Sequence, residues 1–134
     1  MGKSSKVVYP HSGLTEKIIG SAFQVHNRIG PFFPEKIYEN ALAKELTSIG
    51  IAVVQQQRLS INFGGKPIGD FVVDLLVDNR VVVEVKAVRF AQKDHIDQLL
   101  SYLKASGFEV GLLLNFSRSV EIKRLIFSDW KKSP

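Results

Sequence analysis

Three charged residues lie inside two stretches of the chain that are otherwise mostly apolar. Asp74 interrupts Ile68–Val77, and Glu84 and Lys86 interrupt Val81–Val88. Moving a carboxylate or an ammonium group out of water is unfavourable unless the group is paired, hydrogen-bonded or bound to a metal. The three residues therefore indicate a site in which they act together.

Their chemistry favours a divalent cation. Two neighbouring carboxylates repel each other unless a cation lies between them, and oxygen ligands suit Mg²⁺ or Mn²⁺. Glu84 and Lys86, two positions apart on one strand, project from the same face. Lys86 could orient or deprotonate a water, or stabilise negative charge on a phosphate. The alternative is a buried ion pair without chemistry, which accounts for any two of the residues better than for all three.

The hairpin between the two stretches decides whether Asp74 and Glu84 can share a site. A two-residue turn would leave them on opposite faces of the sheet. A three-residue loop at 78–80 would pair Val77 with Val81 and bring Asp74 opposite Glu84. A shared site therefore predicts the three-residue loop.

Hydrophobic periodicity places helices and strands around these residues. The predicted helices are Leu14–Ile29, with Thr15 as its N-cap, Pro34–Ile49 and Gln92–Ser106. The predicted strands are Ile51–Phe63, Ile68–Val77, Val81–Val88 and Val110–Phe116, and the alternation in Ser119–Phe127 is compatible with a last strand. The order strand, helix, strand around Gln92–Ser106 predicts a parallel crossover. The fold class is therefore α/β.

Glu35 opens the second predicted helix and is expected to face inward. It stands three residues before Tyr38 and seven before Leu42, both in the apolar stripe of that helix. The alternative is an acid that stabilises the N-terminus of the helix. Lys36 and Glu39 fall outside the stripe and are expected on the solvated surface.

Composition sets outer limits on the function. The chain has 134 residues, which suits a single domain over 1–134, with 1–12 and 128–134 expected to be flexible. It has no cysteine, which excludes disulfides and thiolate metal sites, and no apolar run long enough for a signal peptide or a membrane span. A cytoplasmic protein without membrane contact is expected. The net charge of +5 gives weak support for a polyanionic partner.

The spacing of the charged residues resembles that of a known superfamily. Asp74, followed after about ten residues by Glu84-Val85-Lys86, resembles the PD-(D/E)XK nucleases. Gln98 and Tyr102, four residues apart on the next helix, resemble the Gln-x-x-x-Tyr motif of the RecB-like members.

A longer resemblance is to the small prokaryotic GxxExxY proteins, a branch of that superfamily. The matching segments are Val25-His26, Gly30-Pro31, Glu35 to Glu39, Asp74 to Val77, Glu84 to Ala87 and Gly111 to Phe116. Glu35 and Tyr38 occupy the Glu and Tyr positions of the family name, and Phe32 occupies the Gly position. Val72 stands where members often have an arginine.

The resemblance implies a restriction-endonuclease-like core of order αβββαβ, with a central mixed sheet of four to five strands flanked by helices. It implies metal-dependent hydrolysis of phosphodiester bonds in nucleic acid, with DNA favoured over RNA. Asp74, Glu84, Glu35 and the backbone carbonyl of Val85 would hold Mg²⁺ or Mn²⁺. The implied catalytic residues are Asp74, Glu84 and Lys86, supported by Gln98 and Tyr102.

The sequence says less about the binding partners of such a site. Basic residues that could contact a nucleic-acid backbone are Arg58, Lys66, Arg89, Lys93 and Lys104, although each also suits solvated surface. A homodimer is compatible with the resemblance. Phe32 and Val72 keep an alternative open, namely a catalytically silent module of the same fold that binds nucleic acid or a protein partner.

Overall fold

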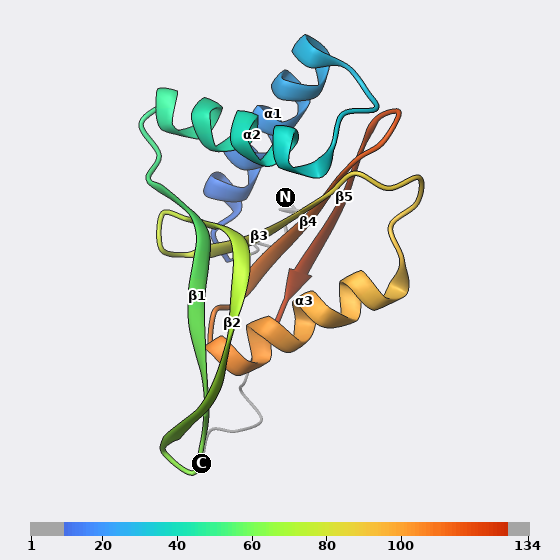
Figure 1. Cartoon of the computed structure of the whole chain (residues 1–134). Coiled ribbons are helices and arrows are strands. Elements are labelled where there is room, and N and C mark those ends of the chain that lie inside the picture. The colour runs from blue at the N-terminus through green and yellow to red at the C-terminus, as the bar shows by residue number, and fades with distance from the viewer. Residues whose placement is uncertain (1–9, 129–134) are drawn as a thin grey trace, which may run out of the picture.

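A five-stranded mixed sheet lies between helices in the computed structural model, which describes residues 10–128 (Figure 1). The helices are α1 (Ser12–Ile29), α2 (Glu35–Ser48) and α3 (Lys93–Ser106). The strands are β1 (Val53–Phe63), β2 (Lys66–Val77), β3 (Val81–Lys86), β4 (Val110–Phe116) and β5 (Val120–Ile126). They are ordered β1-β2-β3-β4-β5, and the pair β3–β4 is parallel while the other pairs are antiparallel. The predicted α/β class, the parallel crossover and the last strand are confirmed.

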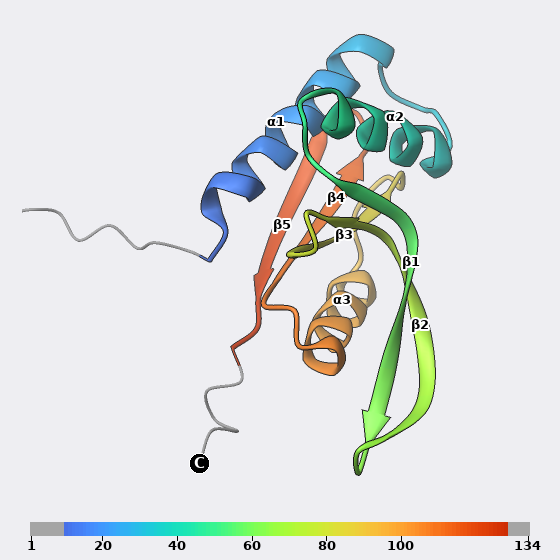
Figure 2. The same ribbon diagram turned by 90° about the vertical axis from the view of Figure 1, so that its left-hand side faces the viewer.

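The helices cover opposite faces of the sheet. Residues of α1 and α2, among them Ile18 and Leu42, pack with one set of strand residues into a buried cluster. Leu99 and Leu103 of α3 pack with another set on the opposite face. Figure 2 shows the same arrangement, with α1 and α2 together and α3 apart from them. The strands β3 and β4 are buried on both faces, which explains their continuous apolar sequences.

The start of α1 differs from the prediction. The helix begins at Ser12, so Thr15 lies within it and the prediction of Thr15 as N-cap was wrong. The Thr15 hydroxyl instead donates to the Ser12 carbonyl at 3.1 Å and accepts from Arg124 Nη2 at 3.1 Å. A buried hydroxyl needs such partners, and a contact with β5 is not visible in local sequence. The terminal segments 1–9 and 129–134, expected to be flexible, lie outside the described residues.

The hairpin between β2 and β3 has the loop length that a shared site requires. Val77 pairs with Val81, which leaves the three residues 78–80 as the loop. Asp78 and Asn79 adopt left-handed backbone conformations, with φ of 52° and 54°. Asp and Asn tolerate this conformation better than most residues, so the sequence suits the loop that the structure shows.

Strand β2 changes face near Asp74. Phe71 and Val73 pack in the cluster beneath α3, whereas Leu75 and Val77 pack in the cluster beneath α1 and α2. In a regular strand these four alternate positions would share one face. The irregularity therefore lies at Asp74, the residue between the two pairs.

The neighbouring strands show the same irregularity. The β2–β3 ladder ends at the pair Leu75–Val83, one position before Asp74 would face Glu84. On the other side, Gln56 of β1 lies opposite Asp74 and has a φ of 53°. Asp74 is therefore placed where β2 separates from β3, at the beginning of a gap between strands.

No helix in the described part of the chain is long and apolar enough to cross a membrane.

Candidate active site

Asp74 and Glu84 are joined by hydrogen bonds at the point where their strands separate. The backbone N–H of Asp74 donates to Glu84 Oε1 at 3.0 Å, and the backbone N–H of Val85 donates to Asp74 Oδ2 at 2.8 Å. Each carboxylate thus takes the place of a backbone carbonyl in the ladder. The predicted meeting of Asp74 with Glu84 is confirmed, and it is achieved through side chains.

The surroundings of both carboxyl groups favour their neutral forms. The pKa of Glu84 is raised to about 7, chiefly by burial and then by the nearby charge of Asp74, while the Asp74 N–H and the Lys86 ammonium act in the opposite direction. Burial also raises the pKa of Asp74, against the hydrogen bond from the Val85 N–H. A positive charge between the two groups would relieve both effects.

Glu35 approaches this pair from α2. It is half-buried, and burial raises its pKa, opposed by the charge of Lys86 and reinforced by Asp74 and Glu39. The charges of Lys86 and Asp74 on the strands act on Glu35, which is consistent with its predicted inward orientation. Its role as a metal ligand stays a prediction.

Glu39 belongs to the same acidic group, although it was expected on the surface. Only 3% of it is exposed, so that expectation was wrong. Its carboxylate accepts hydrogen bonds from Gln55 Nε2 at 2.8 Å, Gln56 Nε2 at 3.0 Å and Lys36 Nζ at 3.1 Å. The sequence contained one sign of this position. Glu39 stands four residues after Glu35, and residues at that spacing lie on one helical face.

Gln56 links the helix carboxylate to the strand carboxylate. Its side-chain amide donates to Glu39 Oε1 at 3.0 Å and to Asp74 Oδ1 at 3.3 Å. A left-handed backbone is unfavourable for a residue with a side chain, so Gln56 is held in an unusual conformation beside the acidic pair. Sequence reasoning missed it, because the run Gln55-Gln56-Gln57 is typical of an exposed strand.

The α3 residues differ in their relation to the acidic pair. Tyr102 stacks on Phe71 with ring centroids 4.2 Å apart. Burial raises its pKa, and the charges of Glu84 and Asp74 add to that shift, so its hydroxyl lies within their field. Gln98, one turn earlier, is exposed, and its side chain has no hydrogen bond among residues 10–128. Their proposed support of Lys86 or a phosphate stays a prediction.

The site offers few protein ligands for a metal. Within residues 10–128 no group of three or more His, Cys, Asp or Glu side chains is arranged to hold an ion. Mg²⁺ commonly uses one or two carboxylates together with waters and substrate phosphates. The half-buried Asp74 and the buried Glu84, both with raised pKa values, fit that pattern. Glu35 and the Val85 carbonyl remain predicted additional ligands.

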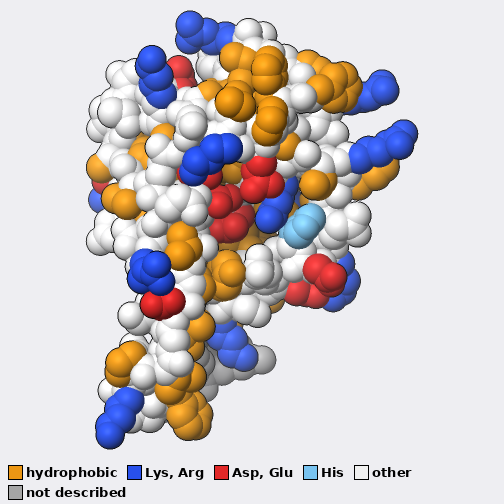
Figure 3. Space-filling model, viewed as in Figure 1, with side chains coloured by type: hydrophobic (Ala, Val, Ile, Leu, Met, Phe, Trp, Pro, Cys, Tyr) orange, Lys and Arg blue, Asp and Glu red, His pale blue; other side chains and the backbone are white. Residues whose placement is uncertain are grey.

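The predicted basic residues are spread over several elements. Arg58 pairs with Asp70 at 3.0 Å and Lys93 pairs with Asp97 at 2.7 Å. Lys66 begins β2 at the hairpin tip, Lys104 lies in the last turn of α3, and Arg89 follows β3. Figure 3, viewed from the same side as Figure 1, shows acidic side chains gathered in a hollow at the centre of the molecule, with basic side chains around the hollow. Arg89 is the basic candidate nearest in sequence to Lys86.

The order of elements and the placement of Asp74, Glu84 and Lys86 define a nuclease-like α/β protein. A family model for the PD-(D/E)XK nuclease superfamily matches residues 12–125. The chain belongs to the PD-(D/E)XK nuclease superfamily. Its assignment to the narrower GxxExxY branch stays a prediction.

Similarity to individual proteins is more distant. No curated protein matches the chain. Among solved structures, the crystal structure of SSO0001 matches with a TM-score of 0.54 and 20% sequence identity over 72% of this chain. The match spans 52% of that structure's chain, so this chain corresponds to about half of it. At this identity the likeness supports the fold only.

Proposed function

We propose that this chain is a Mg²⁺- or Mn²⁺-dependent nuclease that hydrolyses phosphodiester bonds of nucleic acid, with DNA favoured over RNA. The observation that supports the proposal best is the direct contact between Asp74 and Glu84 beside Lys86. A divalent cation bound between Asp74 and Glu84 would polarise the phosphate and activate water.

The chain's own residues have distinct tasks in this proposal. Asp74 and Glu84 hold the cation, and the raised pKa of Glu84 ties cation binding to its deprotonation. The Lys86 ammonium, whose charge acts on Asp74, Glu84 and Glu35, positions the attacking water or stabilises the charge that develops on the phosphate. Tyr102 and Gln98 support Lys86 or a phosphate oxygen from α3.

The test is cleavage of end-labelled single-stranded, duplex and branched DNA, and of matching RNA, with Mg²⁺, Mn²⁺ or EDTA. We expect metal-dependent products from the wild type and a loss of at least a hundredfold in Asp74→Asn and Lys86→Ala. Asp78→Asn, in the hairpin loop, and Lys44→Ala, exposed on α2, are the matched controls and should retain full activity. Undiminished cleavage in either site variant would remove that residue from the mechanism.

The alternative is a catalytically silent module of the same fold that binds nucleic acid or a protein. Within residues 10–128 no group of three or more acidic, His or Cys side chains is arranged to hold an ion, and this favours it, as do Phe32 and Val72. Calorimetric titration with Mn²⁺ separates the two functions, because a binding module needs no cation at Asp74 and Glu84. A cytoplasmic location and a homodimer stay predictions.

A further inference from the structure

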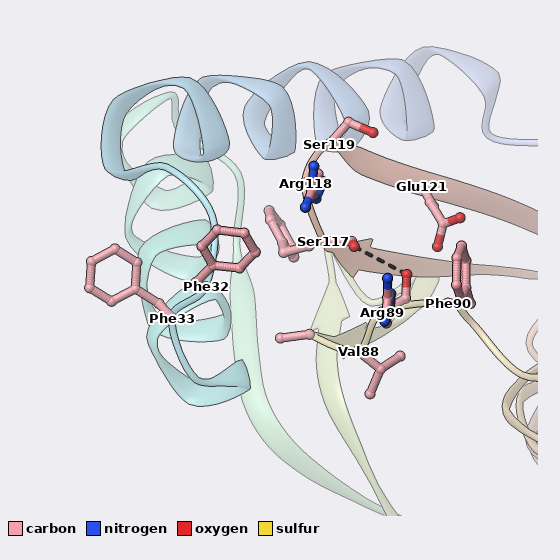
Figure 4. A pocket seen from close by; sticks show the side chains of 11 residues that line it. Phe32, Phe33, Val88, Arg89, Phe90, Ser117, Arg118, Ser119 and Glu121 are labelled. Carbon is pink, nitrogen blue, oxygen red and sulfur yellow. Dashed lines mark hydrogen bonds between the residues drawn. The ribbon is translucent and has the colours of Figure 1, made fainter.

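A pocket of about 670 Å³ opens at the carboxyl ends of the parallel strands β3 and β4 (Figure 4). This volume is in the range of small-molecule sites, and in α/β sheets ligands commonly bind beyond the carboxyl ends of strands. Its side chains include Phe32 and Phe33 from the α1–α2 loop, Arg89 and Phe90 from the loop after β3, and Arg118 from the β4–β5 turn. It does not include Asp74, Glu84 or Lys86.

The pocket nevertheless adjoins the acidic site along two chain segments. Its wall begins at Ala87, the residue after Lys86, and a two-residue step from Lys86 to Val88 spans at most about 7 Å. On the other side, Phe33 lies two residues before Glu35, the first residue of α2. A chain molecule lying across the acidic site would reach the pocket with its next unit.

The aromatic side chains of the pocket are unusually exposed. Phe32 is 79% exposed, Phe90 64% and Phe33 44%. Phe32 also has a φ of 75°, a conformation that suits glycine and is unfavourable for a bulky residue. Neither the exposure nor the backbone conformation of Phe32 favours folding, and such strained positions often belong to functional sites.

Hydrogen bonds hold the walls of the pocket in place. The Tyr38 hydroxyl donates to the Gly30 carbonyl at 2.6 Å and accepts from the Phe33 N–H at 3.3 Å. Asn115 bonds both backbone groups of Val88, at 2.9 Å each. The rings are therefore presented by loops that are already ordered, which lowers the entropy lost on binding.

Positive charge lies beside the rings. Arg89 and Arg118 are both exposed, and the structure shows no ion pair for either within residues 10–128. The Arg89 guanidinium lies over the Phe90 ring, 5.9 Å from its centroid. Guanidinium groups recognise phosphate through paired N–H donors, and aromatic faces stack on nucleobases.

We propose that this pocket binds an unpaired nucleotide, with its base against the phenylalanine rings and a phosphate at Arg89 and Arg118. This inference rests on the proposed function, because it takes the adjoining phosphodiester to lie at Asp74 and Glu84. Paired bases in a duplex are stacked inside the helix and cannot reach these rings. The substrate class is therefore single-stranded nucleic acid, or a strand end or flap that supplies unpaired bases.

The test measures binding without catalysis. A short single-stranded DNA with 2-aminopurine, and the same sequence as a blunt duplex, are titrated into the full chain in EDTA. We expect the single strand to bind at least tenfold more tightly than the duplex, and Phe90→Ala and Arg118→Ala to weaken single-strand binding about tenfold. Phe63→Ala, which removes another exposed ring at the tip of the β1–β2 hairpin, and Arg80→Ala, in the β2–β3 loop, are matched controls and should change nothing.

A second variant separates binding from folding. Phe32→Gly relieves the left-handed backbone, so we expect it to melt at or above the wild-type temperature while it binds the single strand more weakly. Equal affinity for single strand and duplex would overturn the proposal, and so would a single-strand affinity that is unchanged in all three pocket variants. A pocket that binds a peptide instead of a nucleotide would give the second result. Single-strand binding with this variant pattern but no cleavage would contradict the proposed hydrolysis alone, whereas cleavage with unaffected variants would contradict the pocket alone.

Discussion

The backbone N–H of Asp74 donates a hydrogen bond to the carboxylate of Glu84 at 3.0 Å. A side chain on β3 thus occupies the position where a backbone carbonyl would continue the ladder, and β2 is free to turn away. The same contact that holds the acidic pair together also marks where the sheet opens. Structure and proposed chemistry therefore depend on the same two residues.

Glu84 should make the stability of the metal-free protein depend on pH. Its pKa in the folded protein is about 7, against an ordinary value of 4.5, so the folded form holds a proton that the unfolded form has released. The free energy of unfolding should therefore fall as pH rises from about 4.5 to 7, by on the order of 3 kcal/mol. Glu84→Gln should remove most of this fall, whereas Glu16→Gln, at an exposed position of α1, should retain it. Urea unfolding in EDTA at pH 5 and pH 8 measures the difference, and identical profiles for wild type and Glu84→Gln would contradict it.

Asp74→Asn should separate metal binding from folding. The asparagine carbonyl can still accept the Val85 N–H, but one of two acceptor oxygens is lost, so we expect a stability change of about 1 kcal/mol. The rise in melting temperature that Mn²⁺ produces at pH 8 should disappear, because stabilisation by a ligand follows its affinity. An unchanged Mn²⁺ effect in this variant would place the cation elsewhere.

Gln56→Gly should lower activity with little effect on stability. Relief of the left-handed backbone offsets the loss of the hydrogen bonds to Glu39 and Asp74, so the free energy of unfolding should stay within about 1 kcal/mol of wild type. Cleavage should fall roughly tenfold to a hundredfold, as for other residues that orient metal ligands, and the Mn²⁺ concentration needed for half-maximal rate should rise. Gln57→Gly, one residue along β1, should show the reverse pattern, with lower stability and normal cleavage. Equal cleavage by the two variants would exclude a positioning role for Gln56.

Tyr38→Phe should destabilise the loop between α1 and α2, which carries Phe32 and Phe33 of the pocket. It removes a hydroxyl that bonds Gly30 and Phe33, while the buried ring retains its stacking on Phe116 at 4.5 Å. We expect a loss of about 1–2 kcal/mol in the free energy of unfolding, measured with urea. Tyr102→Phe, whose hydroxyl has no hydrogen bond within residues 10–128, should lose less than about 0.5 kcal/mol. A Tyr38→Phe protein as stable as Tyr102→Phe would show that the loop does not depend on this hydroxyl.

Much of the fold and the centre of the site could be predicted from local patterns. The residue spacing along β3 placed Glu84 and Lys86 on one face, whereas the sequence left the loop between β2 and β3 open between two and three residues, and the structure shows three. The helices and strands followed from periodicity in the same way, with boundaries within a few residues. Alternation of side chains and hydrophobic periodicity act over short distances, so the sequence alone was sufficient for these features.

Only the tertiary structure decided the features that join distant segments. The change of face in β2 at Asp74 depends on packing against α3 on one side and α2 on the other. The burial of Glu39 depends on glutamines from β1, and the pocket brings Phe32 beside Arg118 across most of the chain. These arrangements result from contacts between segments whose own sequences favour ordinary surface helices, strands and turns. The sequence by itself therefore singled out the two carboxylates and the lysine, while the tertiary structure decided the loop that brings Asp74 to Glu84 and what surrounds them.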